Sequence, residues 1–210
     1  MATPTTIDTE TELSDVNSIL GAIGQSPITS ISAGSANPEV AFIYNLLRDC
    51  NVDIQNEGWH FNTEKHVAYI PDADGKIAIG TDILKMDVSD GWEKNQYDVV
   101  RRNGNLYDKY DHTDDWSDLP SDGIDLDIVR LFTFEDLPSV FQRYIIARCS
   151  RKAATQLVGN PQLVQLLAQE ESLARAACLE YDCNQGNHSM FGLPEDSVYN
   201  GYQPFRSLLR

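Results

Sequence analysis

Apolar residues recur every three to four positions in two segments near the start of the chain. The first segment follows a capping-box pattern formed by Thr9 and Glu12 and ends at Gly24. The second segment begins with Asn37 and Pro38, which suit the N-cap and first-turn positions of a helix. The spacing predicts two helices with apolar faces at Leu13, Val16, Leu20 and Ile23, and at Val40, Ile43, Leu47, Cys50 and Ile54.

The middle of the chain changes to short alternating runs separated by turn residues. Residues 66–70 and 76–79 flank a Pro-Asp-Ala-Asp-Gly segment and predict a hairpin, and residues 83–88 predict a third strand. Residues 97–102 and 105–111 flank Asn103-Gly104, a strong signal for a two-residue hairpin turn. That register places Val100 opposite Tyr107 and Asp98 opposite Lys109. With a further strand at 124–132, we expect one antiparallel sheet.

Helical periodicity returns in the last third of the chain. One helix is predicted to start at Asp136 and Pro138 and to stop at Gly159, and a second runs from Pro161 to about residue 186. Because the connection is short, the two helices should pack as an antiparallel pair. Their predicted buried positions are Val140, Phe141, Tyr144, Ile145, Ala153 and Leu157 in the first, and Leu163, Leu166, Leu167, Leu173, Ala174, Ala177 and Tyr181 in the second.

The order helix, helix, sheet, helix, helix predicts an α+β fold. We expect a helical bundle domain formed by residues 1–62 and 134–186, with an antiparallel β lobe inserted at 63–133. Residues 187–210 lack periodicity but contain Phe191, Tyr199, Tyr202 and Phe205. Aromatic residues are uncommon in segments without a binding role, so we expect an extended C-terminal docking tail.

Charge narrows the choice of partners. The 210 residues include 32 acidic and 16 basic side chains, a net charge of −16. The acidic excess lies in residues 1–60, with eight acidic residues and one basic, and in 61–133, with sixteen and eight. Such a surface repels nucleic acid phosphates, so tight DNA binding is not expected, although DNA could pass along it.

Other bulk features indicate synthesis in a cytoplasm. No apolar run approaches the roughly 18 residues that a membrane helix needs, and the N-terminus lacks the basic start of a secretory signal. Cys50, Cys149, Cys178 and Cys183 lack the spacing of a zinc site or a disulfide framework. We expect reduced thiols, three of them on helix faces and packed as small apolar side chains.

The acidic stretch between residues 111 and 127 is the main candidate for chemistry. It holds seven aspartates, Asp111, Asp114, Asp115, Asp118, Asp122, Asp125 and Asp127, without an intervening Lys or Arg. Dense carboxylates can bind calcium or supply the acid and nucleophile of a glycosidase. EF-hand spacing is missing, so a solvated loop is the favoured interpretation. For Asp72–Gly75 a tight turn is favoured over a calcium loop.

Signals for other chemistry are missing from the sequence. It has no phosphate-binding glycine motif and no nucleophile elbow, and we expect no catalytic site, metal or cofactor. A basic group consisting of Arg143, Arg148, Arg151 and Lys152 lies in one predicted helix. We expect an ion-paired helix face, with an interface to an acidic neighbouring subunit at Arg148 and Arg151 as the alternative.

Several sequence blocks, in order, resemble the tail tubular protein A family of short-tailed phages. The blocks are Leu13–Pro27 (LSDVNSILGAIGQSP), Gln55–Asn62 (QNEGWHFN), Tyr69–Pro71 (YIP), Arg102–Asp108 (RNGNLYD) and Phe134–Pro138 (FEDLP). The resemblance covers most of residues 13–182 and rests on the order and spacing of the blocks, because no single block is specific.

The resemblance implies a structural virion protein that acts as a head-to-tail connector, or adaptor. Its partners would be further copies of itself in a dodecameric ring, the portal protein above and the tail nozzle, tail tubular protein B, below. Genomic DNA would pass through the ring without specific binding, and no membrane is involved. Interface residues expected in the docking tail, on the portal or on an adjacent subunit, are Tyr199, Tyr202, Phe205 and Arg206. The alternative is a tail-associated hydrolase of bacterial surface polysaccharide that uses the acidic stretch; a host-interacting acidic decoy is a third hypothesis.

Overall fold

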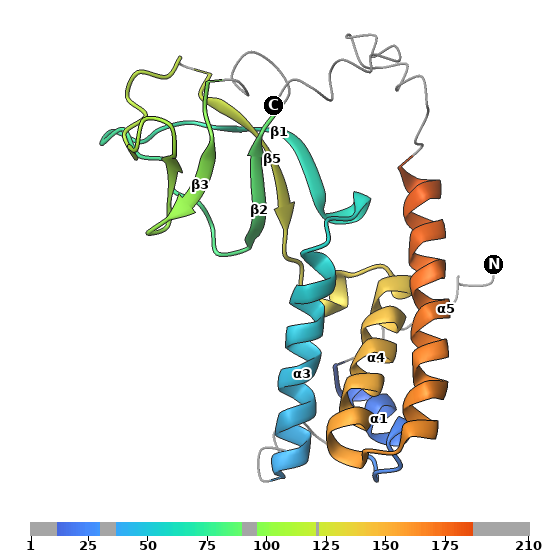
Figure 1. Cartoon of the computed structure of the whole chain (residues 1–210). Helices are drawn as coiled ribbons and strands as arrows, with labels where there is room; N and C mark the ends of the chain where they lie inside the picture. The colour runs from blue at the N-terminus through green and yellow to red at the C-terminus, as the bar shows by residue number, and fades with distance from the viewer. Residues whose placement is uncertain (1–11, 30–36, 90–95, 121, 187–210) are drawn as a thin grey trace, which may run out of the picture. The chain divides into compact units, whose positions relative to one another are not determined.

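The computed structural model describes residues 12–29, 37–89, 96–120 and 122–186 (Figure 1). These residues form helices and small antiparallel sheets, which confirms the predicted α+β class. The chain divides into two compact units. We call the segments up to Ile54 and Phe132–Tyr181 the helical unit, and Gln55–Leu131 with residues 182–186 the β unit.

The two N-terminal helices form as the apolar pattern predicts. Helix α1 spans Glu12–Ala22 and α3 spans Pro38–Gln55. Gly24, at φ +80°, follows α1, and the N–H of Gln25 bonds the carbonyl oxygen of Leu20 at 2.8 Å, closing the helix end. The N–H of Glu39 bonds Oδ1 of Asn37 at 3.0 Å, which confirms Asn37 as the cap of α3. The buried residues include Val16 and Leu20 of α1, Ile23 directly after it, and all five predicted positions of α3.

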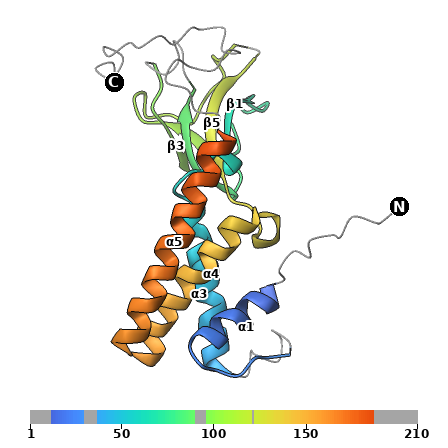
Figure 2. The same ribbon diagram turned by 90° about the vertical axis from the view of Figure 1, so that its right-hand side faces the viewer.

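Helix α4, Ser139–Ala153, lies between α3 and α5 in the helical unit (Figures 1 and 2). It starts later than predicted, because Asp136 belongs to a separate short 3-10 helix, Phe134–Asp136, and accepts a hydrogen bond from the Thr133 hydroxyl at 2.6 Å. The α4 axis continues into a π-helical turn, Ala154–Val158, which ends at Gly159. The wider turn shifts the phase of the side chains, so the prediction that Leu157 is buried is wrong; it is 40% exposed.

Helix α5, Pro161–Gln185, buries much less of its surface than its leucine pattern predicts. Leu167 and Cys178 are the buried residues of this helix, and Tyr181 packs edge-on against Phe141 of α4 with ring centroids 6.0 Å apart. Leu166, Leu173 and Ala177 are exposed, so their predicted burial is wrong. The reason is packing: α4 covers one side of α5, and the leucines extend around more of the helix than one neighbour can cover.

The β unit contains two sheets where the sequence predicts one. In the first sheet β5, Ile124–Arg130, lies between β1, Thr63–Tyr69, and β2, Ile83–Val88, and both pairings are antiparallel. The second sheet pairs β3, Val99–Arg102, with β4, Asn105–Asp108. The apolar core of the unit consists of Ile77, Ile79, Ile83, Val88, Val99, Leu106, Trp116, Ile124, Leu126 and Ile128.

The predicted hairpin between residues 66–70 and 76–79 is wrong. Strand β1 pairs with β5 instead. The segment around Ile77 and Ile79 lies beside the second sheet: the N–H of Leu106 bonds the carbonyl oxygen of Ile77, and the N–H of Ile79 bonds that of Gly104, both at 2.8 Å. Because this segment pairs with the second sheet, Ile77 and Ile79 are buried in the apolar core of the unit.

The hairpin at Asn103-Gly104 has the predicted register. Val100 pairs with Tyr107, and both turn residues have positive φ, +54° and +83°. The strands are shorter than predicted, but Lys109 Nζ still lies 2.6 Å from Asp98 Oδ2. A pattern that combines turn chemistry with matched cross-strand pairs therefore fixed this register locally.

Candidate functional site

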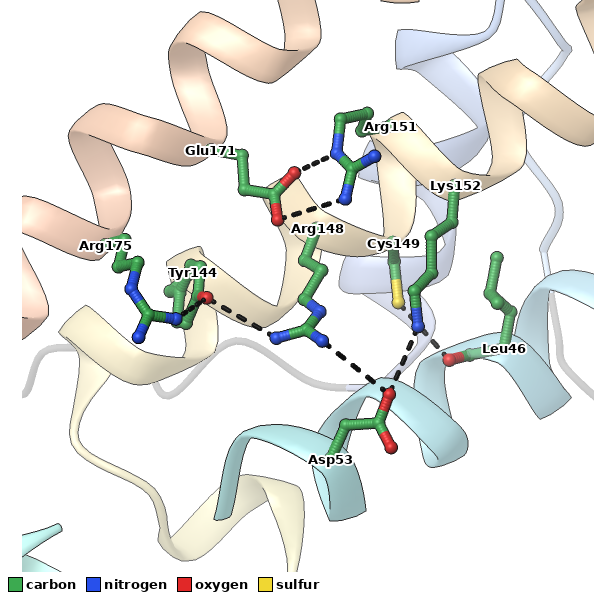
Figure 3. Close-up of polar contacts among 9 residues, drawn as sticks. All are labelled: Leu46, Asp53, Tyr144, Arg148, Cys149, Arg151, Lys152, Glu171 and Arg175. Atoms are coloured by element: carbon green, nitrogen blue, oxygen red, sulfur yellow. Dashed lines mark hydrogen bonds and ion pairs between the residues drawn. The ribbon is translucent and has the colours of Figure 1, made fainter. Parts of the chain in front are cut away.

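A cluster of charged side chains connects α3, α4 and α5 inside the helical unit (Figure 3). Helix α4 supplies Tyr144, Arg148, Arg151 and Lys152, whose spacings of four, three and one place them along one side of the helix. Helix α3 supplies Asp53, and α5 supplies Glu171 and Arg175. The cluster is therefore assembled from residues up to 122 positions apart, between Asp53 and Arg175.

Asp53 pairs α3 with two cations of α4. Its Oδ2 lies 3.2 Å from Lys152 Nζ and 3.8 Å from Arg148 Nη2. The carboxylate is half exposed, whereas the two cationic side chains are 28% and 22% exposed. The pairs therefore lie at the rim of the helix packing, where solvent screens part of their attraction.

Arg151 and Glu171 connect α4 to α5 through two hydrogen bonds. Nε of Arg151 donates to Oε2 of Glu171, and Nη2 donates to Oε1 at 3.3 Å. The hydrogen bond with Glu171 raises the pKa of Arg151 above its ordinary value. This two-pronged geometry is specific to a guanidinium, so lysine could not replace it.

Tyr144 contacts both Arg148 and Arg175. Its buried hydroxyl oxygen accepts hydrogen bonds from Arg175 Nη1 at 2.8 Å and from Arg148 Nη1 at 3.5 Å. Arg175 also lies over the Tyr144 ring, 5.9 Å from its centroid. The cluster contains four basic groups and two carboxylates, so it has a local excess of two positive charges (4 − 2) in a chain of net charge −16.

The cluster confirms part of the sequence interpretation. The ion-paired helix face expected for Arg148, Arg151 and Lys152 is present. Asp53, Glu171 and Arg175 were not anticipated, because their partners lie on other helices and no local spacing signals the pairing. The other expected interface residues, Tyr199, Tyr202, Phe205 and Arg206, lie outside the described residues.

Cys50 and Cys149 lie beside this cluster as a buried thiol pair. Cys149 Sγ donates a hydrogen bond to the carbonyl oxygen of Leu46 at 3.4 Å (Figure 3). The hydrogen bond with Cys50 and burial raise the pKa of Cys149 well above its ordinary value. Cys178 is also buried, and Cys183 is exposed. The expectation of free, mostly packed cysteines is confirmed.

The acidic stretch has the contacts of an ordinary surface loop. Asp114 Oδ2 lies 2.9 Å from Lys76 Nζ, and the hydrogen bond from Lys76 lowers the pKa of Asp114. A hydrogen bond from Ser117 likewise lowers the pKa of Asp115. A glycosidase general acid needs a raised pKa, so neither Asp114 nor Asp115 has the property that this acid requires.

Metal binding has no support in the described ranges either. Asp72 Oδ1 accepts hydrogen bonds from the N–H groups of Asp74 and Lys76 at 2.9 and 2.8 Å, and Gly75 has φ +74°. This is the tight turn that the sequence favours over a calcium loop. Among the residues that the structure describes, no three His, Cys, Asp or Glu side chains form a group able to hold a metal ion.

The fold and the cluster define a class of protein: an acidic, two-unit α+β chain whose charged side chains hold helices together. Against known protein families, residues 13–188 match tail tubular protein. The match covers most of the chain, and the chain belongs to the tail tubular protein family. It is accordingly a structural component of a phage tail. A search of curated proteins gave no match. No helix in the described ranges is long and apolar enough to span a membrane.

Proposed function

We propose that this chain is an adaptor ring subunit that joins the portal to the tail nozzle at the head-to-tail junction. The observation that carries the proposal is the ordered set of blocks resembling tail tubular protein A, which all fall within the matched residues 13–188. In this proposal twelve copies form the ring, the portal binds above and tail tubular protein B below. Subunits are made in the host cytoplasm and assemble into the virion.

The charge distribution supports passage of DNA through the ring. Residues 61–133, which include most of the β unit, carry half of the acidic excess, with sixteen acidic and eight basic residues. A ring multiplies the charge of each subunit by its copy number. An acidic lumen repels phosphates and therefore lets DNA move without being held.

The charged cluster supports an interface at Arg148 and Arg151. Both guanidinium groups keep some solvent exposure, 22% and 33%, and the cluster has a local excess of positive charge. In an assembly of acidic subunits, these groups would attract carboxylates of a neighbour while their own ion pairs hold the helices in place.

The C-terminal tail would supply a second contact. Tyr199, Tyr202, Phe205 and Arg206 combine aromatic rings with a guanidinium, the residue types that dominate binding at protein interfaces. We propose that they dock on the portal or on an adjacent subunit. Deleting residues 187–210 should then abolish assembly while leaving the helical circular dichroism signal unchanged; normal assembly of the truncated chain would rule out this role.

The proposed role is non-catalytic. Asp114 and Asp115 are engaged by Lys76 and Ser117, and these hydrogen bonds lower the pKa of each carboxyl. A variant with Asp111, Asp114, Asp115 and Asp118 changed to Asn should still assemble. Loss of a polysaccharide-degrading activity in that variant would instead identify an enzyme.

The test is to mix the purified protein with the portal complex of its phage and to image the particles by electron microscopy. We expect an additional ring beneath the portal. If the protein stays unbound in the presence of a folded portal, the adaptor proposal is wrong. The variant with four Asp→Asn changes is the matched control, because it removes charge without touching the charged cluster.

A further inference from the structure

Two buried thiols meet where α3 and α4 pack together. Cys50 of α3 and Cys149 of α4 are both fully buried. The Sγ of Cys149 donates a hydrogen bond to the carbonyl oxygen of Leu46 at 3.4 Å, and Figure 3 shows this sulfur pointing toward α3. Leu46 precedes Cys50 by one helical turn, so its carbonyl oxygen also accepts the N–H of Cys50 within the helix. Cys149 therefore lies against the turn of α3 that holds Cys50 and forms a hydrogen bond with the Cys50 thiol.

A covalent bond between these two sulfur atoms would join the chain on both sides of the β unit. Helix α3 precedes the strands in the sequence, and α4 follows them. Cys50 and Cys149 are 99 positions apart (149 − 50), and strands β1 to β5 all lie between them. A disulfide that closes a long loop restricts the unfolded chain more than one that closes a short loop, and it therefore favours the folded state more strongly.

The charged cluster makes Cys50 the more reactive of the two thiols. The hydrogen bond with Cys149 and the nearby cations Lys152 and Arg148 lower the pKa of Cys50, against the opposing effect of burial. The same hydrogen bond, together with burial, raises the pKa of Cys149. Because the thiolate is the nucleophile in thiol–disulfide exchange, Cys50 should react first and Cys149 second.

We propose that Cys50 and Cys149 form a redox-sensitive pair, which a small-molecule disulfide converts into a disulfide bond between α3 and α4. In the first step, the Cys50 thiolate attacks one sulfur of the oxidant, whose S–S bond breaks, and a small thiolate leaves. In the second step, the Cys149 thiol loses its proton to solvent and attacks the Cys50 sulfur, which releases the other small thiolate. The two cysteines lose two electrons, and the oxidant becomes two thiols, which take up the two protons that the cysteines lost.

A tail protein meets two redox environments. A cytoplasm keeps thiols reduced, whereas disulfides persist on a virion outside the cell. We therefore expect thiols during assembly and the disulfide in the released particle, where it would hold α3 against α4. The inference uses the membership in the tail tubular protein family and does not depend on the proposed ring.

Oxidation of the purified full-length protein tests the proposal. The protein is treated with oxidised glutathione, its remaining thiols are alkylated, and the chain is digested with trypsin without reductant. Trypsin cleaves after Lys and Arg, so the two cysteines fall in separate peptides, 49–65 and 149–151. We expect mass spectrometry to find these peptides linked in at least tenfold excess over any other disulfide, and dithiothreitol to separate them. Alkylated thiols at both positions in the oxidised protein would overturn the proposal.

Two variants locate the reaction. Cys149→Ala removes the second thiol, so the reaction should stop at a mixed disulfide between glutathione and Cys50. Cys183→Ser removes the exposed thiol and is the matched control, which should form the link as the wild type does. A link that requires Cys183 would overturn the proposal, as would glutathione that stays on Cys50 of the wild type. If Cys149→Ala fails to fold, the wild-type product still decides between these outcomes.

Urea unfolding measures the consequence of the bond. The oxidised wild type should keep its helical circular dichroism signal and unfold at a higher urea midpoint than the same protein in dithiothreitol. Cys50→Ala should unfold at the same midpoint in both conditions. An equal or lower midpoint for the linked protein would show that the bond does not hold the helices together. Alkylation and digestion of purified phage particles should find the same link, and free thiols at both positions there would overturn its role in the virion.

Discussion

The side-chain nitrogen of Asn62 lies 3.1 Å from the carbonyl oxygen of Arg130, a residue 68 positions further along the chain. The same amide also bonds the carbonyl oxygen of Gln55 at 2.9 Å, and its Oδ1 accepts the N–H of Trp59 at 2.8 Å. Asn62 is fully buried. One side chain therefore joins the segments at which the chain enters and leaves the β unit, and it bonds three backbone groups at once.

Replacing Asn62 should destabilise the β unit. Asn62→Ala removes all three of these hydrogen bonds, which we expect to lower the free energy of unfolding by about 2–3 kcal/mol. All three tryptophans, Trp59, Trp92 and Trp116, belong to the sequence of this unit, so urea unfolding followed by tryptophan fluorescence reports on it. Asn56→Ala, at an exposed position, is the control and should change little. Equal stability of the two variants would show that the amide bonds are not needed.

Substitution by alanine should cost different amounts of stability at two glycines with positive φ. Gly104 has φ +83° and open space around it, so Gly104→Ala should cost only the left-handed backbone conformation, about 1–2 kcal/mol. At Gly123, φ +77°, a Cβ would overlap the carbonyl oxygen of Tyr69, and Gly123→Ala should cost about 2 kcal/mol more. Fluorescence-detected urea unfolding measures both. Similar losses at the two positions would contradict the close approach at Gly123.

The ion pair between Arg151 and Glu171 should couple α4 to α5 measurably. A double-mutant cycle with Arg151→Ala and Glu171→Ala is expected to give a coupling of about 1 kcal/mol, since solvent reaches about a third of the arginine. The free energy of unfolding of each variant is measured by urea unfolding, followed by the helical circular dichroism signal. The exposed pair Asp98 and Lys109 serves for comparison and should couple by less than about 0.5 kcal/mol. A larger coupling free energy for Asp98 and Lys109 than for Arg151 and Glu171 would mean that burial does not strengthen the α4–α5 pair.

The Asp114–Lys76 pair should make a pH-dependent contribution to stability. The hydrogen bond from Lys76 lowers the pKa of Asp114 in the folded state, so its contribution is present above the ordinary carboxyl pKa of about 3.9. The contribution is lost as the pH falls through the lower, folded-state pKa. The difference in urea midpoint between wild type and Asp114→Asn should therefore be present at pH 7 and shrink as the pH falls below the ordinary carboxyl pKa of about 3.9. Asp118→Asn, at an exposed position, is the control; a difference that persists at low pH would exclude this ion pair as its cause.

Local signals in the sequence were sufficient wherever a few neighbouring residues fix the structure. Asn37 caps α3, Gly24 and Gly159 close their helices, and Asn103-Gly104 sets the register of β3 and β4. These features depend on backbone conformations and short-range hydrogen bonds that residue type alone specifies. The same holds for the family resemblance, which rests on short blocks in a fixed order and agrees with the tail tubular protein match.

Only the tertiary structure decided which elements become neighbours. Strand β1 pairs with β5, about sixty residues away, and not with the following segment, because that segment bonds to Gly104 and Leu106 instead and so buries Ile77 and Ile79 in the core. The partners of Arg151 and of Asn62 were invisible for the same reason, since no sequence spacing relates Glu171 or Arg130 to them. The leucines of α5 show the converse: periodicity indicates that a helix has an apolar face, whereas the number of helices packed around it determines how much of that face is buried within one chain.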